Sequence, residues 1–133
     1  MNNQALNQFA YHSKLANGYD VNCVGPIIKA ARVFNALHGI TGVLLFDGER
    51  FFQYVEGESA TINALAERIH RDPRHQHVTA LLHEPLHTGR RYPHWSMAFS
   101  SVDEDAIIDQ MIASTPHEAV ALLLDRHLTL DID

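Results

Sequence analysis

The sequence lacks several features that define common protein classes. It has one cysteine, Cys23, among 133 residues, so a disulfide within the chain is excluded and a reducing compartment is the default. No apolar run approaches the ~20 residues that a membrane span needs. The start, MNNQALNQ, also lacks the charged and apolar regions of a signal peptide. We therefore expect a cytoplasmic protein that does not bind a membrane.

Basic residues and phosphate-binding loops are also scarce. Ten Lys and Arg residues stand against 16 Asp and Glu, for a formal net charge of −6, which argues against nucleic acid as a partner. The stretch GITG at 39–42 follows an expected helix and precedes an expected strand, the reverse of the order in a P-loop or Rossmann site. The ten histidines have no cysteine or carboxylate at a recognised ligand spacing, so we expect no metal site.

The apolar residues that are present predict an α+β fold. Alternation and helical spacing predict strands at 6–13, 40–46, 50–56, 77–84 and 93–100, and helices at about 26–37 and 59–71. The order β-α-β-β-α-β predicts a ferredoxin-like sandwich, to which a fifth strand is added. The two crossover helices can cover one face of this sheet. Two C-terminal helices with apolar stripes are expected to cover the other face.

Three polar side chains are expected on apolar faces. Gln53 in RFFQYVEG shares a strand face with Phe51 and Val55, and Tyr11 points inward from the first strand. Asn35 lies one turn before the end of the first helix. A buried amide or phenol needs hydrogen-bond partners, so these groups either fix the core through a Tyr–Gln hydrogen bond or form the wall of a ligand site.

Five segments carry a resemblance that favours the ligand site. FAYHS, ARVFNALHGITGVLLF, FFQYVEG, RIHRDPRH and RRYPHWSMAF occur in this order over about residues 6–100. In this the sequence resembles the BLUF family, the flavin-binding blue-light sensors. The resemblance implies a photosensor domain over 1–100 and a C-terminal helical cap or output segment over 101–133. It also implies non-covalent FAD, with FMN as the alternative.

The resemblance also implies roles for individual residues. Tyr11 matches the photoactive tyrosine, Gln53 the glutamine between it and the flavin, and Asn35 the asparagine that hydrogen-bonds the ring. Trp95 and Met97, expected on one face of the last strand, match a pair whose exchange near the flavin signals. Further cofactor contacts are expected from Ser13, Lys29, Arg32, Ile40, Arg68, Asp72, Arg74 and His75. Lys29 and Arg32 could neutralise phosphates or could be ordinary surface charges.

Alternatives of other classes stay open at this level. A flavin-free ferredoxin-like interaction module would have the same fold. A small acyl-phosphate hydrolase would need an arginine cradle, whereas residues 14–25 contain Lys14 as their only cation. We expect no enzyme. The 34 residues from 100 to 133 are too few for a cyclase or phosphodiesterase domain, so the signal should pass to a separate, unidentified protein. We also expect a homo-oligomer, most simply a dimer.

Overall fold

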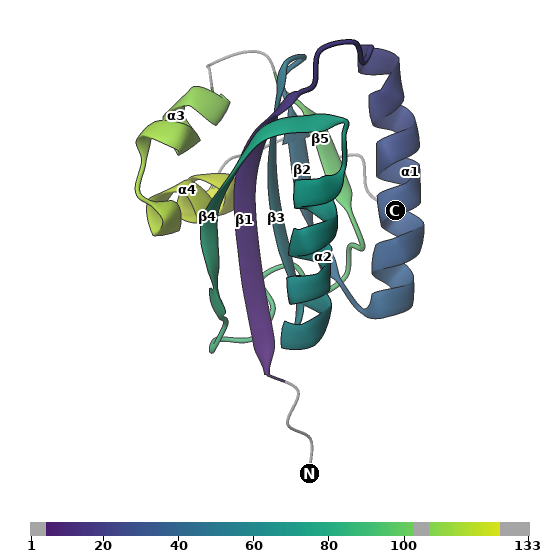
Figure 1. Ribbon diagram of the computed structural model, residues 1–133. Coiled ribbons are helices and arrows are strands. Elements are labelled where there is room, and N and C mark those ends of the chain that lie inside the picture. Colours follow the sequence, from purple (N-terminus) through teal and green to yellow (C-terminus); the bar gives the residue numbers. More distant parts are fainter. Residues whose placement is uncertain (1–4, 103–106, 126–133) are drawn as a thin grey trace.

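The computed structural model describes residues 5–102 and 107–125 and has a five-stranded sheet between two pairs of helices (Figure 1). In chain order the elements are β1 (Leu6–Leu15), a 3₁₀ turn (Val21–Cys23), α1 (Val24–His38), β2 (Thr41–Phe46), β3 (Arg50–Glu58), α2 (Ser59–Arg71), β4 (His75–Pro85), β5 (Ala98–Ser101), α3 (Ile107–Ala113) and α4 (Pro116–Asp125). The predicted α+β class and element order are confirmed.

The strand order is β4-β1-β3-β2-β5. The first four strands pair antiparallel, as a ferredoxin-like unit requires, and β5 adds parallel to the outer edge of β2. The prediction of a strand from residue 93 is wrong at its start, because β5 begins only at Ala98. The segment between β4 and β5, residues 86–97, is irregular, and we call it the β4–β5 segment.

Local sequence explains the main chain reversals. Gly39 ends α1 in the left-handed conformation, with φ of 67°, and its N–H donates to the carbonyl of Asn35. Between β2 and β3, one carboxylate oxygen of Asp47 accepts from the backbone N–H groups of Glu49 and Arg50 at 3.0 and 2.6 Å. These contacts fix the hairpin that the Asp-Gly pair predicts.

The sheet separates two apolar cores. The α1–α2 core includes Phe9, Tyr11, Leu44, Phe51 and Val55 together with the inner faces of α1 and α2. The α3–α4 core lies on the opposite face and includes Ala10, Val43, Phe52, Tyr54 and the buried sides of α3 and α4. Alternate residues of β3 thus enter different cores, and the two C-terminal helices cover the second face as expected (Figure 1).

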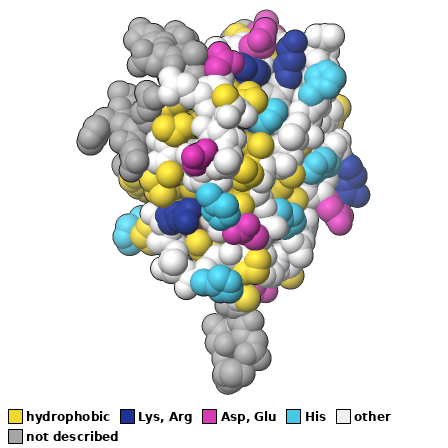
Figure 2. Space-filling view, turned by 90° about the vertical axis from the view of Figure 1, so that its left-hand side faces the viewer, with side chains coloured by type: hydrophobic (Ala, Val, Ile, Leu, Met, Phe, Trp, Pro, Cys, Tyr) yellow, Lys and Arg dark blue, Asp and Glu magenta, His cyan; other side chains and the backbone are white. Residues whose placement is uncertain are grey.

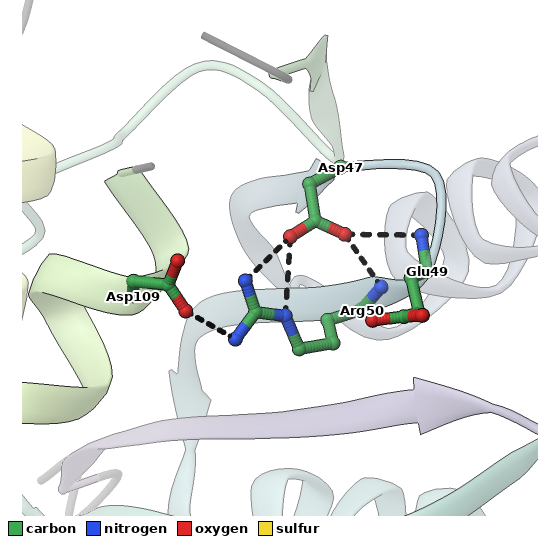
Figure 3. A network of polar contacts seen from close by, with 4 residues as sticks. All are labelled: Asp47, Glu49, Arg50 and Asp109. Atoms are coloured by element: carbon green, nitrogen blue, oxygen red, sulfur yellow. Dashed lines mark hydrogen bonds and ion pairs between the residues drawn. The ribbon is translucent and has the colours of Figure 1, made fainter. Parts of the chain in front are cut away.

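One local and one long-range polar contact fix the C-terminal helices. Thr115 and Glu118 form a capping box at the start of α4, since each backbone N–H donates to the other's side-chain oxygen. Arg50 on the β2–β3 hairpin donates to Asp109 of α3 at 2.6 Å and to Asp47 at 2.9 Å (Figure 3). Arg50 therefore connects the hairpin to α3.

The histidines are dispersed on the face that Figure 2 shows. Figure 2 looks from the side of α3, α4 and β4 and shows the histidines spread over the surface rather than gathered. Among the described residues, no three His, Cys, Asp or Glu side chains are grouped to hold a metal ion. Within the same ranges, no helix combines the length and apolar character needed to cross a membrane.

Candidate functional site

A cavity of about 410 Å³ lies between α1 and α2 over the α1–α2 side of the sheet. Part of its wall is apolar: Ile27, Ala31 and Phe34 project from α1, and Leu65 and Ile69 from α2. These residues recur at helical spacing, so each helix presents one apolar stripe to the same space. The volume is in the range of small-molecule sites, which are mostly apolar with a few placed polar groups.

The first polar pair at this cavity is Tyr11 and Gln53. They are directly opposite each other on the antiparallel strands β1 and β3, and only 1% and 6% of their surfaces are exposed. The Tyr11 hydroxyl donates to Gln53 Oε1 over 2.6 Å. Burial, and next the negative charge of Asp72, raise the pKa of the Tyr11 phenol far above its usual 10.0. Tyr11 therefore keeps its proton and acts as the donor.

The other end of the Gln53 amide points toward Met97. Gln53 Nε2 donates to Met97 Sδ at 3.7 Å, and the Met97 side chain is fully buried in the α1–α2 core. A thioether is a weak acceptor, so the Gln53 amide nitrogen has only a weak hydrogen bond here. Gln53 also lines the cavity. Its N–H donors are thus available to a polar ligand.

Residues of α1 and β2 bind the backbone around Met97. Asn35 Nδ2 donates to the carbonyl of Ser96 at 2.8 Å, and Arg32 Nε donates to the carbonyl of Met97 at 2.9 Å. The Gly42 N–H donates to the carbonyl of Trp95 at 3.0 Å. Three successive carbonyls therefore have donors from outside their own segment, and Asn35 contributes to the cavity wall at the same time.

The expectation that Trp95 and Met97 share a face is wrong. Met97 belongs to the α1–α2 core, whereas Trp95 packs against the α3–α4 core beside Tyr92, with ring centroids 6.0 Å apart. The reason is that both residues precede β5. Side-chain alternation is a property of a regular strand, and this segment has no strand pairing to impose it.

Charged groups lie at the α2 end of the cavity. Arg74 donates through Nε and one terminal nitrogen to the two oxygens of Asp72, at 2.9 and 2.8 Å. Partial burial alone would raise the pKa of the Asp72 carboxyl, but these hydrogen bonds and one from the Arg74 backbone outweigh it and lower the pKa. Arg68 of α2 lies over the Phe34 ring of α1, 4.0 Å from its centroid. Arg68 thus links the two helices beside the cavity.

His75 connects the charged end to Tyr11. Its Nδ1 is 2.7 Å from Ser13 Oγ, and its ring lies against Tyr11 and Phe51, with centroids 5.9 and 4.8 Å apart. Burial lowers the pKa of the His75 imidazole, and the Asp72 carboxylate offsets this only in part. His75 is therefore neutral at pH 7.

The structure brings most of the predicted residues together. The cavity is lined by Tyr11, Asn35, Gln53, Arg68, Asp72, Arg74 and His75. Ser13 contacts it through His75. Ile40 is buried in the α1–α2 core but does not line the cavity. Lys29 lies in a shallow groove on the outer side of α1, and Arg32 binds Met97, so neither lines the cavity.

Sequence reasoning missed part of the site. The two helices are expected to cover the ring faces, but Phe34 and Leu65 are not singled out, because apolar residues at helical spacing are more often ordinary core. Arg71 also lines the cavity but looks like a surface cation, since its i,i+4 partner is Glu67 at 3.7 Å. Nothing in the sequence signals the role of Arg32 at Met97, because its partner is 65 positions away.

Known proteins share this arrangement of elements. Residues 6–98 match BLUF, described as sensors of blue-light using FAD. Over 100 residues the chain is 32% identical to the photoactivated adenylate cyclase subunit beta of Euglena gracilis, a match that covers 74% of this chain and 12% of that protein. The chain thus spans a small part of that relative's length.

Solved structures resemble the chain over most of its length. The dark-state structure of BlrB, a BLUF protein, is 35% identical with a TM-score of 0.78, and the match covers 91% of this chain and 93% of that one. The structure of Klebsiella pneumoniae BlrP1 with FMN and cyclic diGMP is 26% identical with a TM-score of 0.67, and the match covers 93% of this chain and 30% of that one.

Proposed function

The chain belongs to the BLUF family of blue-light sensors, and on this premise we propose that it is a photoreceptor that binds one flavin non-covalently between α1 and α2. The observation that carries the proposal is the buried hydrogen bond from Tyr11 to Gln53 beside a cavity with a partly apolar wall. FAD is the proposed cofactor, and FMN is the alternative.

The residues at the cavity fit a flavin. A flat apolar ring suits the space between the Ile27–Phe34 face of α1 and the Leu65–Ile69 face of α2. Asn35 and Gln53 would hydrogen-bond the polar edge of the ring, because both line the cavity and each amide has two N–H donors and an acceptor oxygen. Arg68 and Arg74 would favour the anionic part of the cofactor. Lys29 and Arg32 are less suited to that role, since they lie elsewhere.

Tyr11 and Gln53 supply the proton chemistry. A bound flavin would supply blue-light absorption and, once excited, a strong oxidant. The raised pKa of Tyr11 keeps its phenol protonated in the dark. Tyr11 would release this proton if it gave an electron to the excited flavin, and it would recover both when the electron returned. The proton would then move along the 2.6 Å bond to Gln53 Oε1. An amide can accept at oxygen and release from nitrogen, or rotate, so Gln53 exchanges its donor and acceptor ends without a net change of charge.

The change at Gln53 reaches the β4–β5 segment directly. Gln53 Nε2 contacts Met97, and Asn35 binds both the cavity and the Ser96 carbonyl. Ala98, the next residue after Met97, is buried in the α3–α4 core. We therefore place the output at residues 101–133, of which 103–106 and 126–133 lie outside the described ranges. This segment would pass the signal to a downstream protein. We also propose that it contributes contacts to a homo-oligomer. Equal hydrogen exchange across 93–125 in dark and light would contradict this route.

The proposal is tested by spectroscopy of the purified protein. We expect a yellow protein that releases flavin on denaturation after expression with riboflavin, and a red-shifted absorption band after blue light. Gln53→Leu should keep the flavin and lose the red shift, since the bridging amide is gone. A protein that never contains flavin would favour the flavin-free interaction module instead. A normal red shift in Gln53→Leu would remove the proposed mechanism while leaving flavin binding intact.

A further inference from the structure

A buried carboxylate lies on the sheet face opposite the cavity. Glu56 is in β3, two residues after Tyr54, and none of its surface is exposed. It is the only acidic side chain buried within the described residues. A carboxylate in an apolar core is costly unless donors satisfy it. Its partners therefore show what it does.

Both oxygens of Glu56 accept hydrogen bonds, and two of the three donors come from the β4–β5 segment. The backbone N–H of Arg91 donates to Oε2 at 2.8 Å, and the backbone N–H of Tyr92 donates to Oε1 at 3.0 Å. The Tyr54 hydroxyl donates to Oε2 at 2.8 Å. Burial, and next the Glu56 charge, raise the pKa of the Tyr54 phenol, so it remains a donor. One carboxylate thus satisfies two consecutive backbone groups of an irregular segment.

The neighbouring residue strengthens this attachment. The Arg90 guanidinium donates to the carbonyl of Gly39 at 2.7 Å, to Thr41 Oγ1 at 2.8 Å and to the backbone carbonyl of Glu56 at 3.2 Å. Residues 90–92 are therefore fixed to β3 and to the start of β2. Tyr92 in turn packs against Trp95 on the α3–α4 side.

The β4–β5 segment is consequently bound at two places with different surroundings. Residues 95–97 are bound by Gly42, Asn35 and Arg32, and this attachment includes a cavity residue and the partner of Gln53. Residues 90–92 are bound through the Glu56 carboxylate and through the Arg90 side chain, and neither Glu56 nor Arg90 lines the cavity. A change at the cavity would therefore meet the first attachment directly and the second only through the segment itself. The two residues between them, Pro93 and His94, would accommodate the difference.

From this geometry we infer that Glu56 is a positioning residue for light signalling. It fixes Arg91 and Tyr92, so that a rearrangement at Gln53 and Asn35 changes the placement of Trp95 and Met97 instead of spreading along the segment. The inference rests on the proposed function for its light-dependent part. The attachment itself depends only on the chain and can be measured without a cofactor.

The test is Glu56→Gln, which keeps the shape of the side chain and replaces one acceptor oxygen by a donor. We expect hydrogen exchange of the Arg91 and Tyr92 amides to become about tenfold faster or more in flavin-free protein. The emission of Trp95, the only tryptophan in the chain, should shift as its packing on Tyr92 loosens. In flavin-loaded protein the size of the red shift should stay, while the dark-recovery rate changes by about threefold or more.

Two controls separate positioning from general destabilisation. Glu58→Gln makes the same chemical change two residues later in β3, at a partly exposed position, and should leave all three measurements unchanged. Leu82→Ala removes a buried side chain from the α3–α4 core and should lower stability without selectively freeing the Arg91 and Tyr92 amides. If Glu56→Gln does not fold, Glu56→Asp retracts the carboxylate by one methylene and should give the same selective loss of protection.

The outcomes distinguish this inference from the proposed function. Unchanged exchange at Arg91 and Tyr92 in the Glu56 variants overturns the attachment. Lost protection with a dark-recovery rate equal to that of Leu82→Ala overturns the signalling role. Failure of the wild-type protein to bind flavin or to shift its spectrum overturns the proposed function and the light-dependent part, and exchange in the flavin-free protein still decides whether Glu56 fixes the segment.

Discussion

The hydrogen bond between Tyr11 and Gln53 predicts a strong coupling between two substitutions. Tyr11→Phe removes the donor and leaves Gln53 Oε1 without its partner in a site where 6% of the residue is exposed. Gln53→Leu removes the acceptor and leaves the fully buried Tyr11 hydroxyl without its partner. The double variant replaces both by apolar groups. The single changes each create an unsatisfied buried group, and the double change creates none.

This difference sets the expected magnitude. A buried polar atom left without a partner costs about 1–3 kcal/mol, whereas replacing both partners by apolar groups is nearly neutral. Each single variant should therefore lower the free energy of unfolding by about 2 kcal/mol, and the coupling energy should be about 1–3 kcal/mol. For a chain of this length, about 2 kcal/mol corresponds to a fall of about 7 °C in Tm.

The four proteins of this double-mutant cycle are the wild type, the two single variants and the double variant. Their free energies of unfolding are measured in urea on flavin-free protein, by circular dichroism in the dark. Absence of flavin matters because the cofactor would stabilise whichever variants still bind it. A matched cycle with Tyr19→Phe in place of Tyr11→Phe should be additive, since Tyr19 is exposed. Additivity within about 0.5 kcal/mol for Tyr11 and Gln53 would refute the reasoning.

Three further predictions concern other parts of the molecule. Gly42→Ala should lower the free energy of unfolding by about 3 kcal/mol or more in urea, because a Cβ there would overlap the Tyr54 carbonyl oxygen and lie 2.9 Å from Val55 Cα; an unchanged midpoint would contradict this. Burial lowers the pKa of His75 below 6.5. The neutral imidazole therefore contributes fully to the free energy of unfolding above pH 6.5, and this contribution is lost as the pH falls toward the folded pKa. Between pH 7.5 and 5, the free energy of unfolding should fall less steeply in His75→Gln than in the wild-type protein. Met111→Ala removes a fully buried α3 side chain and should cost about 2–5 kcal/mol, and a cost near zero would mean that α3 does not pack as described.

The sequence predicted most of the fold because its signals are local. Alternation in β3 assigned Gln53 to the same face as Phe51 and Val55, and the structure confirms that face. The Asp-Gly pair marked the β2–β3 hairpin, and Gly39 marked the end of α1. Each of these patterns depends on neighbours within a few residues, where backbone geometry and side-chain periodicity fix the outcome. The inward direction of Tyr11 follows from the same alternation.

Tertiary structure alone decided the pairing and the irregular parts. That Tyr11 lies directly opposite Gln53 depends on the register of β1 and β3, which are 42 positions apart at this pair. Trp95 and Met97 enter opposite cores, contrary to a strand pattern, because residues 86–97 are bound by groups from α1, β2 and β3 rather than by a neighbouring strand. Glu56 follows the regular alternation of β3, but its burial also depends on this segment, whose Arg91 and Tyr92 N–H groups bind its carboxylate. Without a hydrogen-bonded strand, the direction of each side chain is set by distant donors and acceptors, and these come together only when the chain has folded.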